Sequence, residues 1–298
     1  MIEVSDTLSG DEMRIGIRGI FLVWAMPFMV LLVTVAANAA AQGVTAFEPG
    51  ERLEYVLKWS GIAAGDSVME IVAGDIVKGV PLYRVISTAT SRSLVDVFYK
   101  VRNRYETHIH PIDGFSRKYL FNMREGGKRG KRVLIFDQDR HIVTRIVRKN
   151  DQTQSKVYEI PEGTQDNLSA LYALRNEVLK VGDSVTYRVF ESRKNWELII
   201  DVIAAEEIKV KAGRFRTVVV HPKLKFEGIF RRKGELYVYM TDDQWHIPVL
   251  MKSKVRIGSI DAELVRFTLG GGEKDIPSMV LPDEEKDIPS TLTSDEDN

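Results

Sequence analysis

A regular alternation of apolar and polar side chains runs through most of residues 42–269 and constrains the fold more than any other feature. In "RLEYVLKW" it places Leu53, Tyr55, Leu57 and Trp59 on one side of an extended segment. Successive side chains of a strand point to opposite faces, so an apolar face opposed to a charged face indicates antiparallel strands with one side in water. Turn signals such as "IDGF", "FDQDRH" and "TDDQWH" lie between these segments at hairpin spacing. We predict a mainly β protein: one or more curved antiparallel sheets, like a barrel or half-barrel.

One helical pattern, "DNLSALYALRNEVLKVGD", interrupts the alternation. Asp166 is a good N-cap, and Gly182 follows the end of the pattern. The stripe at positions i, i+3, i+4 and i+7 consists of Leu168, Leu171, Tyr172 and Arg175. Further apolar residues cover the other sides, which is typical of a buried helix. We therefore predict a central helix over about residues 166–179 that packs on the concave side of the sheet.

The segments before and after this helix show a weak similarity. "GERLEYVLKW" begins at Gly50 and "GDSVTYRVFE" at Gly182, and both contain Gly, an acid, an aliphatic residue and Tyr at equivalent places. Residues 42–269 are expected to form a single β-rich domain. Two similar halves, about 47–160 and 181–269, joined by the helix are one interpretation, and chance similarity between strand patterns is the other.

The amino-terminal residues predict export. Residues 14–41 combine two arginines, a nearly unbroken apolar run and small-x-small cleavage patterns, so residues 1–41 are expected to contain a signal peptide cleaved near Ala39–Gln42. Met13 is the expected initiator, because the preceding segment is acidic. The apolar run is short for a membrane span, although a retained anchor is the alternative. The chain has no cysteine, so export without disulfides favours a periplasmic protein.

The formal net charge of zero hides an uneven distribution. The 42 basic and 42 acidic residues include two basic and four acidic ones in residues 1–41, and two basic and nine acidic ones in 270–298. Residues 42–269 therefore keep 38 basic and 29 acidic residues, a composition that suits anionic envelope partners such as lipid headgroups, lipopolysaccharide or polysaccharide. Residues 270–298 repeat "EKDIPS", contain few large apolar side chains and are expected to form a disordered acidic tail.

Two groups of residues are candidates for ligand binding. Large apolar side chains on the predicted inner surface would contact an apolar or amphipathic ligand if the helix leaves room for it. They are Trp59, Tyr105, Tyr119, Phe121, Leu171, Tyr172 and Trp196. A basic cluster in "REGGKRGKR" would contact an anionic partner, and it contains Arg124, Lys128, Arg129, Lys131 and Arg132. The alternatives are a filled core and a solvated hairpin tip that protects a sheet edge.

The sequence contains no recognisable catalytic or metal-binding pattern. No nucleophile motif or phosphate-binding loop is present, and no cofactor is expected. His108 and His110 could share one face of a strand, but no third ligand is adjacent, so no metal site is predicted. Asp242 and Asp243 lie in a predicted turn near His246, and these three residues carry the alternative of a hydrolase.

Four segments together resemble a known family. They are "FEPGERLEYVLKWSGIAAGD", "DNLSALYALR", "VKAGRFRTVVV" and "DDQWHIPVLMKSKVRIGSIDAEL". From about residue 47 to 269 the chain is similar to the bacterial exported family called domain of unknown function 3108. The resemblance implies a periplasmic, predominantly β domain after a signal peptide, and it implies no activity and no site residue.

We therefore expect a non-enzymatic periplasmic or cell-envelope protein that binds an apolar or anionic envelope ligand: a lipid, a lipoprotein or a polysaccharide. A hydrolase acting on a cell-wall or surface polymer, and a scaffold for another envelope protein, are the alternatives. Nucleic acid is not an expected partner of an exported chain.

Overall fold

The computed structural model describes residues 45–149, 152–226, 229–230, 235–254, 258–272 and 274–280. The chain divides into two units, and all of the described residues belong to the second, Val44–Asn298. The predicted signal peptide and its cleavage site lie outside the described residues. Among the residues that are described, no helix is long and apolar enough to cross a membrane.

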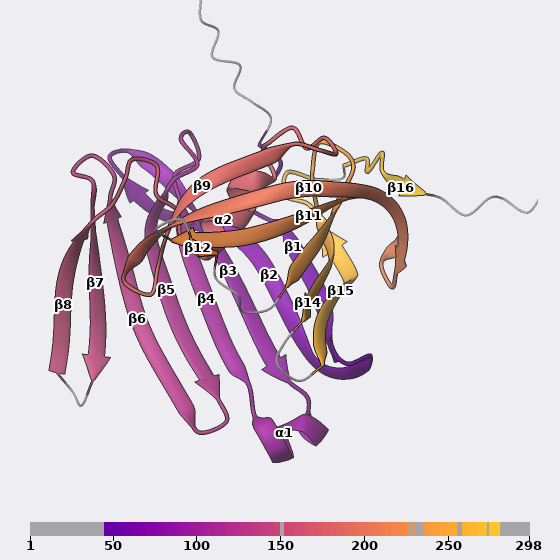
Figure 1. The fold of residues 1–298 in the computed structure, drawn as a ribbon, viewed down its shortest axis with the longest axis horizontal. Coiled ribbons are helices and arrows are strands. Elements are labelled where there is room, and N and C mark those ends of the chain that lie inside the picture. Colours follow the sequence, from indigo (N-terminus) through magenta and orange to yellow (C-terminus); the bar gives the residue numbers. More distant parts are fainter. Residues whose placement is uncertain are drawn as a thin grey trace, which may run out of the picture. The chain divides into compact units, whose positions relative to one another are not determined.

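The second unit is mainly β, as predicted (Figure 1). The first eight strands are β1 (Arg52–Trp59), β2 (Ile62–Val77), β3 (Val80–Ser91), β4 (Arg102–Ile109), β5 (Ser116–Glu125), β6 (Lys128–Asp137), β7 (Ile142–Lys149) and β8 (Gln152–Glu159). The others are β9 (Ser184–Glu191), β10 (Lys194–Val210), β11 (Gly213–Phe226), β12 (Ile229–Phe230), β13 (Leu236–Thr241), β14 (Pro248–Lys254), β15 (Ser259–Thr268) and β16 (Met279–Val280). The helices are α1 (Ser93–Tyr99) and α2 (Asn167–Leu174).

The strands form one curved antiparallel sheet built from two meanders. The order of strands is β8-β7-β6-β5-β4-β3-β2-β1-β15-β14-β13-β11-β10-β9, with β12 and β16 paired to β11. The first meander therefore runs from β1 to β8 and the second from β9 to β15, and the pairing of β1 with β15 joins them. Strands β8 and β9 end the order, so the sheet is not closed by strand pairing within the described residues. The predicted fold class, a curved antiparallel sheet with a central helix, is confirmed.

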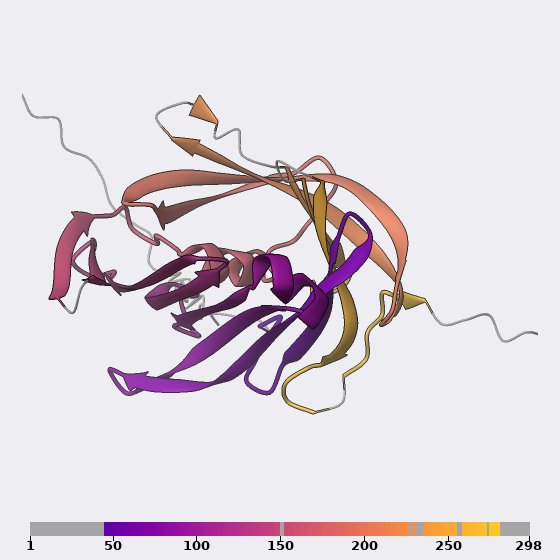
Figure 2. The ribbon, with the colours of Figure 1, turned by 90° about the horizontal axis from the view of Figure 1, so that it is seen from below.

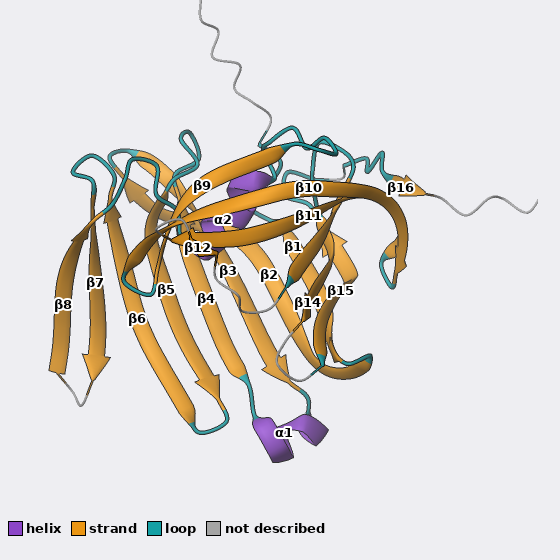
Figure 3. Cartoon of the chain, viewed as in Figure 1, coloured by secondary structure: helices purple, strands orange, loops and turns teal. Residues whose placement is uncertain are grey.

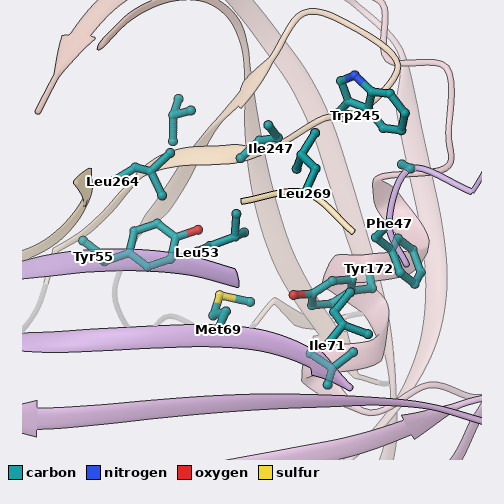
Figure 4. Close-up of a cluster of buried hydrophobic side chains, with 14 of the residues drawn as sticks. Phe47, Leu53, Tyr55, Met69, Ile71, Tyr172, Trp245, Ile247, Leu264 and Leu269 are labelled. Carbon is teal, nitrogen blue, oxygen red and sulfur yellow. The ribbon is translucent and has the colours of Figure 1, made fainter. Parts of the chain in front are cut away.

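The two meanders face each other with α2 between them (Figures 2 and 3). Apolar side chains of both meanders pack together in the space between them. Strand alternation places Leu53 and Tyr55 of β1 in the main core, where they pack with residues from β2, α2 and the segment after β13 (Figure 4). Leu57 is half-buried against this core, and Trp59, at the end of the same alternating series, is 51% exposed. The alternation therefore identifies the inner face correctly, but the side chain at the end of the strand is no longer buried.

Both meanders begin with the same local structure. Gly50 and Gly182 have φ angles of 100° and 97°, a region that a side chain would strain. The N–H of Gly50 donates to the carbonyl of Ile71 and the N–H of Gly182 to that of Val202, each at 2.8 Å. The N–H groups of Ile71 and Val202 donate in return to the carbonyls of Glu51 and Asp183, the residues that follow the two glycines, each at 2.9 Å. The wider similarity of the two halves stays a prediction.

Helix α2 begins as expected and ends earlier. Asp166 accepts hydrogen bonds from the N–H groups of Leu168 and Ser169, and the Ser169 hydroxyl accepts one from the Asp166 N–H in return, which completes a capping box. The helix ends at Leu174 rather than near residue 179. The N–H of Arg175 donates to the Tyr172 carbonyl at 3.2 Å, a tighter i→i+3 turn. Contacts of Arg175 and Asn176 with Ala46 hold this turn. The helix therefore ends here, although the apolar pattern of the sequence continues.

Helix α1 has no counterpart among the predicted elements. It connects β3 to β4 at one end of the sheet, and none of its residues is buried. Its N-cap residue, Arg92, makes no capping hydrogen bond with its side chain. The segment "SLVDVFY" contains two valines and two aromatic residues, a composition more typical of strands. Its helical form therefore depends on tertiary contacts, which are described below.

The expectation of disorder from Gly270 onward is wrong for residues 274–280. Ile276 and Met279 pack against the main core, and Met279 pairs with Phe215 as part of β16. The indole N–H of Trp245 donates to the Asp275 carbonyl at 2.9 Å. Two apolar side chains and a few hydrogen bonds anchor this part of a segment whose composition is otherwise polar. The acidic residues from 281 onward lie outside the described residues.

Candidate functional site

Three segments that are distant in the sequence meet at the guanidinium of Arg175, at the end of α2. Its Nη1 and Nη2 atoms lie 2.6 and 2.7 Å from the two carboxylate oxygens of Glu51. Its Nε donates to the carbonyl of Trp245 at 3.1 Å, and Nη2 also donates to the carbonyl of Ala46 at 3.0 Å. The segment before β1, helix α2 and the β13–β14 connection are therefore joined by one side chain.

This ion pair is closed to solvent. The side chains of Arg175 and Glu51 are 0% and 1% exposed. Burial acts to lower the pKa of Arg175, but the charge and hydrogen bonds of Glu51 outweigh it and raise the pKa. Burial, reinforced by the negative charge of Glu51, also raises the pKa of Tyr172 well above its usual value. The guanidinium lies 5.5 and 5.1 Å from the ring centres of Phe47 and Tyr172. Every contact here is internal, so the cluster holds the fold together and leaves no group for a ligand.

A second buried polar cluster surrounds the carboxylate of Asp166. Oδ2 accepts hydrogen bonds from the hydroxyls of Thr107 on β4 and Ser116 on β5, both at 2.6 Å. Oδ1 accepts the two capping N–H groups of α2 at 2.8 and 3.0 Å. Burial raises the pKa of Asp166, whereas the hydroxyl and backbone donors oppose that shift. Asp166 therefore fixes α2 to the first meander, and this end of the sheet is structural.

The inner face is less completely covered at β4–β6. Tyr105 of β4 and Phe121 of β5 lie opposite each other in the register, with ring centres 5.3 Å apart. Both pack against the core cluster that contains Tyr119, but both remain half-buried. Arg132 of β6 lies opposite Phe121, with its guanidinium carbon 4.0 Å from the ring centre. Two aromatic rings and one cation thus share a partly open part of the inner face.

The candidate ligand residues are therefore divided among several places. Tyr105, Tyr119 and Phe121 come together in one cluster, in which Tyr119 is 4% exposed. Leu171 and Tyr172 instead pack into the cores around α2. The indole N–H of Trp196 donates to the Glu191 carbonyl in the β9–β10 hairpin at 2.9 Å. Trp59 lies at the end of β1, away from this group.

The predicted basic cluster is located on the β5–β6 hairpin. Arg124, Lys128, Arg129 and Lys131 are exposed, and we call these four residues the hairpin tip. Arg132, in contrast, is on the inner face and lies 3.4 Å from both carboxylate oxygens of Glu191. The five residues of the predicted cluster thus separate into an exposed group of four and one inner residue.

The residues of the hydrolase alternative have structural roles. Asp243 accepts hydrogen bonds from Thr241 and Trp245 through Oδ1, and from Ser278 through Oδ2. His246 Nδ1 lies 2.9 Å from the Arg175 carbonyl. Asp242 is exposed beside them. These contacts organise a turn and anchor residues 274–280, and they do not form a paired acid and base.

The histidines of the first meander are not arranged as a metal site. His108 is 3% exposed, with Nε2 3.0 Å from the Glu106 carboxylate. The end of β4 is buried on both faces, since Thr107 and Ile109 beside His108 are buried as well. Across the described ranges, no three side chains of His, Cys, Asp or Glu are grouped so as to hold a metal ion.

We expect Asp243→Ala to release residues 274–280 from the sheet. Ser278 is fully buried and donates to Asp243 through both its N–H and its hydroxyl, at 3.3 and 2.5 Å. Loss of an acceptor for buried donors costs about 1–3 kcal/mol. Hydrogen–deuterium exchange in residues 274–280 should accelerate roughly tenfold or more. Asp242→Ala is the control, and equal exchange in both variants would contradict the anchoring role.

The sequence patterns predicted neither the pairing of Glu51 with Arg175 nor the exposed helix α1. A signal for Arg175 existed, because a charged residue occupies the apolar stripe "L-x-x-L-Y-x-x-R" of a helix judged to be buried. Such a charge needs a buried partner. The partner, Glu51, lies in another of the conspicuous segments, and only the fold brings the two together.

Comparison with known proteins agrees with this description. The family model described as "Protein of unknown function (DUF3108)" matches residues 54–265. A β-barrel-like protein of domain of unknown function DUF1849 from Brucella abortus superposes with a TM-score of 0.52 at 11% identity, covering 74% of this chain and 98% of that one. At this identity the similarity concerns the fold alone. None of the curated proteins matches the chain.

Two further solved structures align over similar lengths with lower scores. A candidate exported protein with a YmcC-like fold from Bacteroides fragilis has a TM-score of 0.32 at 11% identity and covers 74% of this chain and 97% of its own. A candidate lipoprotein from Parabacteroides distasonis has a TM-score of 0.33 at 9% identity, with 75% and 98% covered.

Proposed function

The chain belongs to the DUF3108 family of proteins of unknown function, and we propose a role for it from the side chains on the inner face of the sheet. The protein is a non-enzymatic component of the cell envelope that binds an amphipathic ligand. The apolar part of the ligand contacts Tyr105 and Phe121, and its anionic group contacts Arg132. A lipid with a negatively charged headgroup has this chemistry.

The observation that carries the proposal is the half-buried aromatic pair next to a fully buried part of the inner face. Tyr119, which lies two residues before Phe121 on the same face of β5, is 4% exposed, and Phe136 of β6 is 3% exposed. Tyr105 and Phe121 belong to the same face but keep part of their surface accessible. Apolar surface next to a buried core favours contact with the apolar part of a ligand.

Arg132 is available for an anion because its ion pair is loose. Its distances to Glu191 are both 3.4 Å, whereas hydrogen bonds between charged groups in proteins usually measure about 2.7–2.9 Å. Glu191 also accepts hydrogen bonds from Asn167 at 3.0 Å and from Ser192 at 2.7 Å. Glu191 would therefore keep two donors if Arg132 turned toward a ligand.

Helix α2 limits where the ligand can lie. Tyr172 and Leu174 are 1% and 2% exposed, and Tyr172 packs edge-on against Phe47 with ring centres 4.8 Å apart. Leu171 fills the space between two of the core clusters. The helix thus fills its own end of the inner face, which restricts the proposed site to β4–β6 and the adjoining β9–β10 hairpin.

The proposed location is the periplasm. It is supported by the amino-terminal sequence, which has the charged, apolar and small-residue regions of a signal peptide. The absence of cysteine is compatible with an oxidising compartment. An excess of nine basic residues in 42–269 suits an anionic ligand.

We expect lipid to copurify with the wild-type chain and to be lost from Phe121→Glu. A carboxylate placed against an acyl chain would lose its hydration without gaining a partner, which costs several kcal/mol. Native mass spectrometry and solvent extraction should show a loss of bound lipid of about tenfold or more, since each 1.4 kcal/mol is a factor of ten. The matched control is Ile135→Glu, because Ile135 is 44% exposed on the outer side of neighbouring β6.

A milder variant separates ligand binding from folding. Arg132→Leu keeps the apolar surface, and it should weaken binding of an anionic amphiphile while leaving a neutral one with the same chain unaffected. Equal lipid content in Phe121→Glu and Ile135→Glu, or wild-type protein from which no lipid can be extracted, would refute the proposed function.

A further inference from the structure

We propose that one end of the sheet docks on the surface of an anionic membrane. The surface consists of Leu94, Val97 and Phe98 of α1 with Trp59 and Ile62 of the β1–β2 turn, and we call these five residues the rim. The hairpin tip lies beside it. This proposal does not depend on the ligand proposed for the inner face.

Helix α1 projects large apolar side chains into solvent. Leu94, Val97 and Phe98 are 85%, 77% and 88% exposed. Their spacing of three and four residues places them on one side of the helix. A cluster of large apolar side chains on a surface usually marks a contact with a protein or a membrane. The contact here would be made by a helix that contributes nothing to the core, since none of its residues is buried.

The opposite side of α1 is tied to the sheet. Asp96 forms an ion pair with Arg102 of β4 and accepts a hydrogen bond from the hydroxyl of Ser91 at the end of β3. The hydrogen bonds of Arg102 and Ser91 lower the pKa of Asp96, so it stays ionised and paired. The N–H of Arg92 donates to the carbonyl of Ala64 on β2 at 2.9 Å. The polar contacts hold the helix so that its apolar side points away from the sheet.

The β1–β2 turn adds two more apolar residues at the same end. Gly65 of β2 pairs with Ser91 of β3, so the start of β2 lies next to the start of α1 (Figures 1 and 2). Trp59 and Ile62 are 51% and 75% exposed there. Trp side chains are enriched at membrane–water interfaces, because the ring is apolar and the N–H remains hydrated.

The basic hairpin tip adjoins the helix directly. The N–H of Gly126, between β5 and β6, donates to the carbonyl of Lys100 at 2.8 Å, and Val101 forms a bridge with Glu125. The backbone of Gly126 lies so close to α1 that a Cβ there would be 3.1 Å from the Tyr99 ring. The four exposed cations of the tip, together with Lys100, therefore flank the apolar side chains.

The acidic groups near the rim do not cancel this charge. Asp66 pairs with Arg92, Asp96 pairs with Arg102, and Glu125 accepts a hydrogen bond from Asn103. Apolar side chains bordered by cations match a bilayer surface with anionic headgroups. The burial of the apolar side chains and the attraction of the cations to the headgroups both contribute to binding there. A second copy of the chain fits less well, because in a symmetric contact it would present the same surface, which is bordered by cations and offers no anionic headgroups.

Vesicle sedimentation tests the proposal with residues 42–298, which contain the whole second compact unit and lack the apolar signal segment. We expect binding to phosphatidylglycerol vesicles, at least about tenfold weaker binding to phosphatidylcholine vesicles, and loss of the preference at high salt. Leu94→Ser with Phe98→Ser should weaken binding about tenfold or more, through lost apolar burial. Its matched control is Ile76→Ser with Ile112→Ser, because these residues are 72% and 80% exposed at the opposite end of the first meander.

The charge is tested separately. Lys128→Glu with Arg129→Glu should abolish the preference for phosphatidylglycerol, while Arg140→Glu with Lys180→Glu, outside the rim, should retain most of it. Val97→Asp provides a single substitution for the apolar part, and unchanged thermal unfolding confirms that each variant is folded. Three results would overturn the proposal: equal binding to both kinds of vesicle, wild-type binding by the Leu94 and Phe98 variant, or a dimer that this variant dissociates.

The two proposals can fail independently. Rim variants should keep any lipid bound at Tyr105 and Phe121, and Phe121→Glu should keep vesicle binding. Lipid-free protein that still sediments with vesicles would refute only the inner-face site. Protein that carries lipid but ignores vesicles would refute only the docking surface.

Discussion

Arg175→Met is expected to lower the free energy of unfolding by about 3–5 kcal/mol, because it leaves the Glu51 carboxylate buried without its partner. The substitution also removes the hydrogen bonds that the guanidinium donates to the carbonyls of Ala46 and Trp245. Three segments lose a common attachment. Urea denaturation followed by tryptophan fluorescence and by circular dichroism would measure the change.

The control is Arg188→Met, which breaks an exposed pair. Arg188 and Glu197 are 48% and 36% exposed, although their atoms lie 2.6 Å apart. Exposed ion pairs contribute about 0–1 kcal/mol, so this variant should be nearly as stable as the wild type. The double variant Glu51→Leu, Arg175→Met should regain part of the loss, because an apolar pair removes the uncompensated charge. Similar losses in Arg175→Met and Arg188→Met would contradict the central role of the buried pair.

Asp166→Ala is expected to cost about 3 kcal/mol, from loss of a helix cap worth about 1 kcal/mol and of an acceptor for two buried hydroxyls. Thr107 and Ser116 are both 0% exposed, so water cannot replace the carboxylate without entering the core. The variant should unfold at lower urea concentration, and the amides of α2 should exchange faster. The helix and the first meander lose their joint anchor together.

Two further variants test this explanation. Asp166→Asn should lose less stability than Asp166→Ala, because its amide oxygen can keep the capping bonds and the hydroxyls can rotate to accept from the NH2 group. Asp113→Ala removes an acidic residue from a neighbouring turn where Asp113 is 33% exposed, and it should cost little. If Asp113→Ala were as destabilising as Asp166→Ala, the carboxylate of Asp166 would not be the anchor proposed here.

The parts of the fold that sequence could predict are those determined by local patterns. Alternation identified the strand faces, as with Leu53 and Tyr55, and Asp166 with Ser169 marked the start of α2 because capping depends on residues only three apart. The end of α2 could not be found in this way. It is determined by the contacts of Arg175 with Glu51 and the amino-terminal segment, across a sequence separation of 124 residues.

Helix α1 and residues 274–280 are two further elements that local sequence patterns could not predict. The composition of "SLVDVFY" favours a strand, and the Asp96–Arg102 pair together with backbone contacts to β2 holds it as a helix. The "EKDIPS" repeat looks disordered by composition, yet its first copy is held by Asp243 and the main core. In the candidate site, sequence identified Tyr105 and Phe121 as inner residues, but only the register places Arg132 beside them.

The pairing of β1 with β15 has a consequence for how the chain matures. Leu53, near the start of the sheet, lies opposite Phe267, near its end. A growing chain can form the hairpins of the first meander early, but one side of β1 has no partner until almost the last strand is available. Contacts of such long range form slowly. Part of the sheet therefore stays unpaired until the last strands are available, which makes the pairing of β1 with β15 a late step of folding.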